Sequence, residues 1–503
     1  MELARAIRIV ITIFRTRTTQ LLPFYLLALA VPSIVRVLTF FGIAILAGYL
    51  IGAGRIDAFR EQLAVTDTDP PDPETDPEAF VEWAEGLQPL IETVVTPTSA
   101  GILLITLALT LVGMLILTAA VTAGQFGTCF GLLQGENGII RGIAGFRQHW
   151  VSFVGLFVLE LFLWVVVTGV FVSIVAVAAL LSLVLALFVG IISFFLWLGI
   201  VVAIRALFVF APVSIVVDGA NVSDGLRGSA GFIRAEFANA VIYYVIAVGV
   251  ILGWGGLSST LATLGVPSLA AMGSILLVAP ALDLLKTILF GDYRDAITPP
   301  EAPSERVASQ LNGALRRGLS EMGAFVKATP GYHVLAVAII AAGFGTGWAA
   351  IEPFTGELET SITARIAGLI PPTAALEFFG NNWTVAMTLA YSGVAAAIPA
   401  ITGLWFNGLV FGMYARLEVE PLLLLAFVLP HGIIEIPAII ISGALGLFLG
   451  VAVWRAWRGR IDRVALAESL ERAVWVLLGI GVLLAIAGAI EGFVSPYYFR
   501  LFL

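Results

Sequence analysis

Long apolar runs recur from one end of the chain to the other, separated by short polar or charged stretches. A run of about 20 apolar residues is long enough to cross the hydrocarbon core of a bilayer as a helix. Each such run is predicted to be an α-helix, because lipid offers no partner to unpaired backbone groups. The runs of this kind lie at 21–51, 100–124, 151–178, 183–211, 237–262, 267–290, 331–353, 383–412 and 473–494.

One further apolar segment, 419–454, contains the sequence Pro430-His431-Gly432. Proline removes a backbone donor and glycine weakens a helix, so the helix is predicted to break there. The stretch before the break would rise only about 20 Å, which is short of the hydrocarbon core of about 30 Å. We therefore expect a re-entrant hairpin at 419–454. The fold class that follows is an all-α polytopic membrane protein with about ten transmembrane helices, including this broken helix.

Composition agrees with a membrane protein, since 60% of the 503 residues are hydrophobic and 12% are charged. Soluble domains carry about 45–50% apolar and about 25% charged residues. The net charge of −8 arises in the segment 54–98, which holds eleven carboxylates against two arginines. Lysine is scarce, with Lys286 and Lys327 the only two. An acidic, lysine-poor surface is typical of proteins from salt-loving organisms, archaeal halophiles among them. The alternative is a cation-binding loop.

Arginine and lysine are concentrated on alternate connecting segments. With the N-terminus inside, nineteen of them fall on inner segments and four on outer segments. This bias follows the positive-inside rule. The first apolar run, 21–51, is too long for the apolar part of a signal peptide and is read as the first span. We expect a multi-pass protein of the cell membrane with a cytoplasmic N-terminus and an external loop at 54–98.

An internal repeat indicates the domain organisation. The sequence at 141–146, Arg-Gly-Ile-Ala-Gly-Phe, recurs as Arg-Gly-Ser-Ala-Gly-Phe at 227–232. Each copy is predicted to form a short amphipathic helix at the inner interface, with a structural role or as a docking site for a cytoplasmic partner. We predict a six-span domain at 1–298, a proline-bearing cytoplasmic linker with an amphipathic helix at 299–330, and a second membrane domain at 331–503.

The C-terminal half carries four motifs. They are Asn381-Asn382-Trp-Thr-Val-Ala386, Asn407-Gly408-Leu-Val-Phe-Gly412, Pro430-His431-Gly432-Ile-Ile-Glu435-Ile-Pro437 and Glu491-Gly-Phe-Val-Ser-Pro496. With them, residues 315–496 resemble the stage II sporulation protein M family of integral membrane proteins. The resemblance implies a non-enzymatic membrane component, the sporulation member looking like a scaffold that gathers cell-wall hydrolases at a septal membrane. The N-terminal half weakly resembles uncharacterised prokaryotic membrane domains made of tandem span pairs.

His431 and Glu435 are four residues apart and would share one face of a returning helix. Such a pair could hold a proton or one metal ion, or it could be a satisfied polar pair that anchors the broken helix. Because it supplies two ligands and no third histidine is near in sequence, we predict neither a metal site nor a cofactor. Asn382 and Asn407, near the ends of the predicted span 383–412, are expected to bond backbone groups freed around the break.

Three charged residues lie inside apolar runs: Arg36, Glu160 and Arg205. A lone charge in mid-bilayer costs about 2.5–3.5 kcal/mol on insertion scales. Glu160 and Arg205 fall at similar depth on consecutive antiparallel spans, so we predict that they pair. The glycine-x-x-x-glycine segments 408–412 and 446–450 are signatures of close helix packing, either inside the chain or at a subunit interface.

Catalytic and nucleotide-binding patterns are missing from the sequence. We find no phosphate-binding loop, no nucleophile with its base, and no basic patch with interleaved aromatics for nucleic acid. We expect no enzymatic activity and no nucleic-acid partner. The predicted function is a scaffold or assembly component of a prokaryotic cell envelope, embedded in the lipid bilayer with copies of itself or with other membrane proteins. The alternative is a proton- or ion-coupled transporter, or the permease subunit of an exporter.

Overall fold

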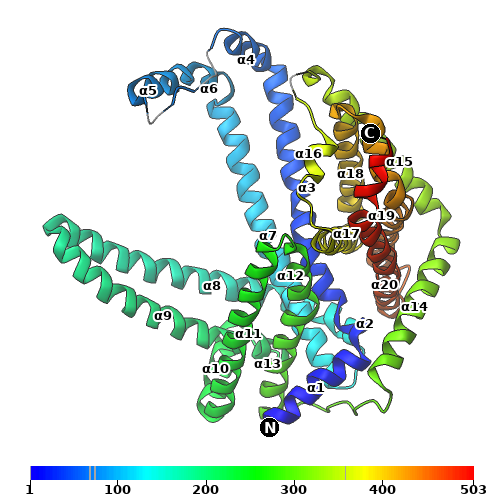
Figure 1. Cartoon of the computed structure of the whole chain (residues 1–503). Helices are drawn as coiled ribbons and strands as arrows, with labels where there is room; N and C mark the ends of the chain where they lie inside the picture. Colours follow the sequence, from blue (N-terminus) through cyan, green and yellow to red (C-terminus); the bar gives the residue numbers. More distant parts are fainter. Residues whose placement is uncertain (1, 67–69, 73–74, 357, 503) are drawn as a thin grey trace. The chain divides into compact units, whose positions relative to one another are not determined.

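The computed structural model describes residues 2–66, 70–72, 75–356 and 358–502 (Figure 1). Every regular element in these residues is a helix, and the sole β pairing among them consists of two isolated bridges. Within this described part of the chain, ten helices are long and apolar enough to cross a membrane. The predicted all-α polytopic membrane fold is therefore confirmed, and the chain is a multi-pass membrane protein.

The N-terminal part of the chain, up to residue 293, is built from consecutive helices. They are α1 (Leu3–Thr16), α2 (Thr18–Leu21), α3 (Pro23–Gly52), α4 (Arg55–Leu63), α5 (Pro77–Gly86), α6 (Gln88–Val94), α7 (Pro97–Leu133), α8 (Gly138–Leu181), α9 (Leu183–Val217), α10 (Val222–Ala235), α11 (Phe237–Thr263), α12 (Pro267–Gly273), the π-helix η1 (Ser274–Val278) and α13 (Ala279–Tyr293).

The remaining helices build the C-terminal part of the chain. They are α14 (Val307–Ala328), α15 (Pro330–Ala350), the 3₁₀ turn η2 (Glu352–Phe354), α16 (Ile362–Ile366), α17 (Pro371–Ser392), α18 (Ile398–Leu417), α19 (Pro421–Trp457), α20 (Arg463–Phe493), α21 (Ser495–Tyr498) and η3 (Phe499–Phe502). The amphipathic helix expected within 299–330 is present as α14, which packs along α20.

The chain divides into two compact units, one made of residues Pro32–Leu115 and the other of the rest. The smaller unit holds most of α3, the acidic segment and the first half of α7. Thr39 and Thr110 face each other across α3 and α7, with 3.4 Å between their hydroxyl oxygens. The acidic segment forms α4, α5 and α6, and its Asp67, Asp69 and Glu74 lie outside the described residues. This division does not test the predicted domain boundary at 299–330, which stays a prediction.

The internal repeat is also a repeat of contacts in the larger unit. Gly142 of the first copy packs against the hydroxyl of Thr128 on α7, and Gly228 of the second copy packs against that of Ser214 on α9. Both members of this contact are displaced by the same 86 residues. The glycine faces of the two copies are therefore covered by the preceding helix. The expected pair of short helices is half right, because the second copy is α10, whereas the first forms the opening turns of the 44-residue α8.

Helices α8 and α9 form an antiparallel hairpin joined at Ser182 (Figure 1). Of the described residues 157–207, three are buried: Ala178, Ala186 and Ser193. Large apolar side chains such as Leu180 and Leu183 are 87% and 83% exposed. For this stretch the two helices have mainly each other as protein neighbours, so their outer surfaces meet lipid or another membrane protein.

The predicted single span 383–412 is wrong, since α17 and α18 are separate helices. They are joined by a tight turn over 393–397, in which Ala396 and Ala397 have φ values of 55° and 64°. Neither glycine nor asparagine occupies these left-handed positions, so residue type did not predict a turn there.

The predicted re-entrant hairpin at 419–454 is wrong as well. Helix α19 runs without interruption for 37 residues and contains both Pro430 and Pro437. At about 1.5 Å per residue it is about 55 Å long, more than the about 30 Å of the hydrocarbon core. Helices in membranes tolerate proline where neighbouring helices cover the freed backbone groups. Here the residues on both sides of Gly432 keep helical geometry, and the turn expected there is absent from this described segment.

The two glycine-x-x-x-glycine segments both mediate contacts within the chain. Gly408 and Gly412 of α18 lie against the backbone of α15. Gly343 and Gly347 of α15 in turn lie against the backbone of α18. The contacts progress in the same direction on both helices, so α15 and α18 run parallel. The segment 446–450 of α19 packs in the same manner on the end of α17 and the turn that follows it. The prediction of close packing is confirmed, with internal contacts at each of these glycines.

Candidate functional site

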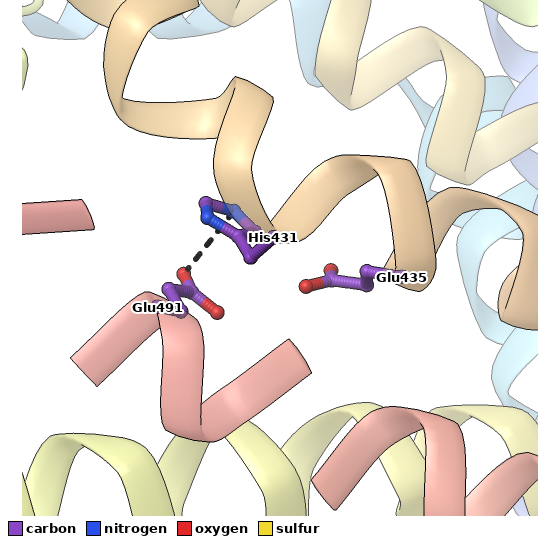
Figure 2. Close-up of side chains that lie close together, drawn as sticks. All are labelled: His431, Glu435 and Glu491. Carbon is purple, nitrogen blue, oxygen red and sulfur yellow. Dashed lines mark ion pairs between the residues drawn. The ribbon is translucent and has the colours of Figure 1, made fainter. Parts of the chain in front are cut away.

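Three ionisable side chains meet where α19 passes the end of α20 (Figure 2). His431 and Glu435 lie one turn apart on α19, and residue His431 is 5% exposed. Glu491 comes from the last turn of α20 and faces both of them. One ligand atom from each of the three side chains lies within 4.8 Å of the others. The cluster is thus built by two helices from positions 56 and 60 residues apart in sequence.

The imidazole of His431 is held from two sides. Its Nδ1 lies 2.9 Å from the hydroxyl oxygen of Ser495 on α21, and its ring meets the edge of Phe427 at a centroid distance of 5.5 Å. Its Nε2 lies 3.8 Å from a carboxylate oxygen of Glu491. Because a hydrogen bond at one ring nitrogen fixes the orientation of the other, Ser495 directs Nε2 toward the carboxylates.

Both carboxylates in the cluster keep a buried oxygen without a hydrogen-bond partner. Among the described residues these atoms are one Oε of Glu435 and one Oε of Glu491. Burying a carboxylate oxygen without a partner is costly, and two neighbouring carboxylates repel each other when both are ionised. The cluster therefore requires either protons or a cation to be stable.

The region around this cluster matches a known protein family. Residues 335–496 match the family model described as Stage II sporulation protein M. The match begins within α15, includes α16 to α20 and reaches α21, so the His431 cluster lies inside it. We call residues 335–496 the sporulation protein M-like region. No curated protein and no solved structure gave a significant match. The predicted resemblance of the C-terminal part is confirmed, and that of the N-terminal half stays a prediction.

The polar cluster predicted in the sporulation protein M-like region is only partly correct. His431 and Glu435 do share a face, but Asn382 and Asn407 have other contacts: Asn382 accepts a hydrogen bond from the amide of Asn381, and Asn407 donates to the carbonyl of Gly403. Trp383, next to Asn382, donates to the carbonyl of Leu477, fourteen residues before Glu491. That separation is about 20 Å along a helix. Pro430 and Gly432 belong to the helix that presents His431 and do not form a turn.

Two residues of the site were not predicted from the sequence, namely Glu491 and its neighbour Ser495, which contacts His431. Both belong to the motif Glu491-Gly-Phe-Val-Ser-Pro496, which supported the family resemblance. Their spacing of four residues matched that of His431 and Glu435, so each motif offered a polar pair separated by about one helical turn. That shared spacing was the available signal, but sequence alone could not show that the two pairs face each other.

The charged pair predicted in the N-terminal half is present. Arg205 on α9 donates to Glu160 on α8, with 2.9 Å between guanidinium nitrogen and carboxylate oxygen. The Glu160 side chain is 15% exposed and the Arg205 side chain 59% exposed. The pair therefore joins the two helices of the hairpin on a surface that is open on the arginine side. Arg36 is exposed at the protein surface on α3, and its role as a charge within the span stays a prediction.

The Glu160–Arg205 pair gives a first testable prediction. Arg205→Leu should lower the free energy of unfolding by about 1–2 kcal/mol, because it leaves the covered Glu160 carboxylate unpaired against apolar neighbours. The double variant Glu160→Leu/Arg205→Leu should recover most of this loss. Thermal unfolding in detergent, monitored by size exclusion, measures both. A double variant that is less stable than Arg205→Leu would contradict a simple charge pair.

Proposed function

We propose that the chain is a non-enzymatic scaffold or assembly component of a prokaryotic cell membrane, which holds other membrane-embedded helices beside it. The observation that carries the proposal is the α8–α9 hairpin. Its outer faces expose large apolar side chains over most of its length, and the chain covers them only sparsely. An open pair of long helices provides a lateral surface that a second copy or another membrane protein can contact inside the bilayer.

The Glu160–Arg205 pair supports the same proposal. Ionisable residues inside membrane segments are rare and commonly mark functional positions. Arg205 is paired on one side and open on the other, so it can offer hydrogen bonds to a polar group of a neighbouring helix. A hairpin that served merely to cross the bilayer would need no charge at this position.

The packing of the sporulation protein M-like region also supports a scaffold. Helix backbones touch directly at Gly343, Gly347, Gly408 and Gly412. Alternating access in transporters requires groups of helices to rock or separate. Helices joined by direct backbone contact form a rigid base, which is more useful for presenting a hairpin than for opening a passage.

Site-specific photo-crosslinking in native membranes tests the proposal. In a Cys129→Ser background, a benzophenone attached to a cysteine at Phe188 on α9 should give a protein adduct of one reproducible mass. The matched control is a cysteine at Ile433 on α19, since the two parent side chains are 63% and 68% exposed. The control should label lipid alone. An adduct with the mass of two chains identifies a second copy as the partner, whereas lipid labelling alone from Phe188 overturns the proposal.

A second candidate function, ion-coupled transport, is favoured by the His431–Glu435–Glu491 cluster, because exchangeable buried groups are the usual coupling sites of transporters. Proteoliposomes distinguish the two functions. Under the scaffold proposal, proton and cation flux through the parent protein equals that of empty liposomes. Flux in the parent that disappears in a folded Glu435→Gln/Glu491→Gln variant would overturn the scaffold proposal and establish transport.

A further inference from the structure

We propose that His431, Glu435 and Glu491 form a binding site for one divalent transition-metal ion, with Zn²⁺ as the ion that fits the ligands best. No metal site was predicted from the sequence because His431 and Glu435 supply only two ligands. The fold adds Glu491 as a third ligand from α20. The inference concerns this cluster alone and holds for either candidate function of the chain.

The geometry is close to that of a three-ligand site. The ligand atoms lie within 4.8 Å of one another, and the His431–Glu491 separation is 3.8 Å. A tetrahedral ion with bonds of about 2.0–2.2 Å holds its ligand atoms about 3.3–3.6 Å apart. Rotation of the two glutamate side chains by about 1 Å toward a common centre is enough to reach this spacing. Rotation about the Cβ–Cγ and Cγ–Cδ bonds of the glutamates moves the carboxylates in this way while the helix backbones stay in place.

The charges of the cluster call for a cation. The site has two carboxylates, and each keeps a buried oxygen that accepts no hydrogen bond in the described part of the chain. Arg365 acts electrostatically on Glu491, but its guanidinium lies 4.8 Å from the centre of the Tyr414 ring. Among the described residues it forms no ion pair with either carboxylate. A dipositive ion bound between Glu435 and Glu491 would satisfy both orphan oxygens and cancel both charges.

The surroundings of His431 also match a metal ligand. Ligating histidines almost always form a second hydrogen bond that fixes the ring and its tautomer. Ser495 occupies that position, 2.9 Å from Nδ1, and leaves Nε2 directed at Glu491. The hydroxyl is completely buried, so water does not compete for this contact. A serine that served solely to satisfy a core histidine would not require two carboxylates on the opposite side of the ring.

The ligand types select the ion. One imidazole nitrogen and two carboxylate oxygens suit Zn²⁺, Mn²⁺ or Fe²⁺, and affinity for a mixed nitrogen–oxygen site is higher for Zn²⁺ than for the other two. Mg²⁺ prefers oxygen ligands in near-ideal octahedral geometry and loses its water reluctantly. A buried imidazole and two glutamates are a poor substitute for that shell. We therefore expect Zn²⁺ to bind in the presence of excess Mg²⁺.

Equilibrium dialysis of the purified full chain against Zn²⁺, followed by elemental analysis, tests the site. The buffer contains excess Mg²⁺ to occupy the exposed carboxylates of segment 54–98. The parent should retain one more Zn²⁺ per chain than the variant His431→Ala/Glu435→Gln/Glu491→Gln. Ser495→Ala should retain the ion with about 10–100-fold lower affinity, as is usual when a supporting hydrogen bond is lost.

Two controls keep the result interpretable. His149→Ala, which removes an imidazole from α8, should bind Zn²⁺ as the parent does. Glu435→Gln/Glu491→Gln preserves side-chain shape and should remain folded, yet its melting temperature should no longer rise on addition of Zn²⁺. Equal Zn²⁺ uptake by the parent and the triple variant, or uptake by neither, would overturn the inference. A folded double variant that retains the Zn²⁺-dependent rise in melting temperature would do the same.

Discussion

Leucine at Gly408 should prevent the sporulation protein M-like region from folding stably, whereas leucine at Gly345 should be tolerated. A Cβ atom at Gly408 would overlap the carbonyl group of Ile340 on α15, and a Cβ at Gly343 would overlap that of Trp405 on α18. A Cβ at Gly345, two residues further along α15, meets nothing within 4 Å. Gly408→Leu and Gly345→Leu add the same side chain, so the difference in stability between them reports the helix contact itself.

The reason for a large effect is that backbone atoms block the new side chain. Overpacking a core costs about 1–3 kcal/mol when neighbouring side chains can move aside. Here α15 and α18 would have to separate along their whole contact, so we expect a loss greater than that range for Gly408→Leu. The fraction of monodisperse protein and its melting temperature in fluorescence-detected size exclusion measure it. Equal stability of Gly408→Leu and Gly345→Leu would show that the two helices are not in contact.

Cysteines at Val419 and Arg460 should label from opposite sides of the membrane. Val419 and Thr360 are held together, with the amide of Val419 donating to the carbonyl of Thr360 at 3.0 Å. The start of α19 therefore lies on the side reached by the end of α15, and the uninterrupted helix carries the chain to the other side before Arg460. A re-entrant hairpin would instead leave both positions on one side.

Labelling with a membrane-impermeant maleimide, in a Cys129→Ser background, decides between these topologies. We expect Val419→Cys to react from outside intact cells together with Glu82→Cys of the acidic segment, because positive-inside bias places that segment outside. Arg460→Cys should react only after the membrane is opened. Reaction of Val419→Cys and Arg460→Cys from the same side would refute a single crossing by α19.

The sequence predicted the number and nature of the membrane helices well, because apolar length is a direct physical requirement of the bilayer. The errors arose at two boundaries. Pro430 was taken as a helix end, although neighbouring helices can satisfy the groups that proline frees. The turn at 393–397 was overlooked because two alanines adopt left-handed conformations there without glycine. Segment 419–454 was predicted to enter and leave on one side, whereas α19 is continuous, and α17 and α18 were predicted as one span instead of two helices, so the two errors compensate for the chain that follows.

Only part of the candidate site was predictable from the sequence, namely the pair on α19. His431 and Glu435 are linked by helical periodicity, which a sequence displays directly. Glu491 joins them through the packing of α19 on α20, whereas the packing of α17 on α20 keeps Asn382 away from them. Contacts between helices depend on which glycine and alanine faces meet. The packing of all the helices together determines these contacts. The spacing of residues within one helix therefore does not predict which helices are in contact.

The parallel pairing of α15 with α18 has a consequence for the timing of assembly. Gly408 follows Gly343 by 65 residues, and ribosomes add about 5–20 residues per second. The glycine face of α15 must therefore wait about 3–13 seconds in the membrane before its partner has been synthesised. During this interval α15 exposes a surface shaped for another helix, so the order of synthesis gives the insertion machinery, or a neighbouring protein, the first opportunity to bind it.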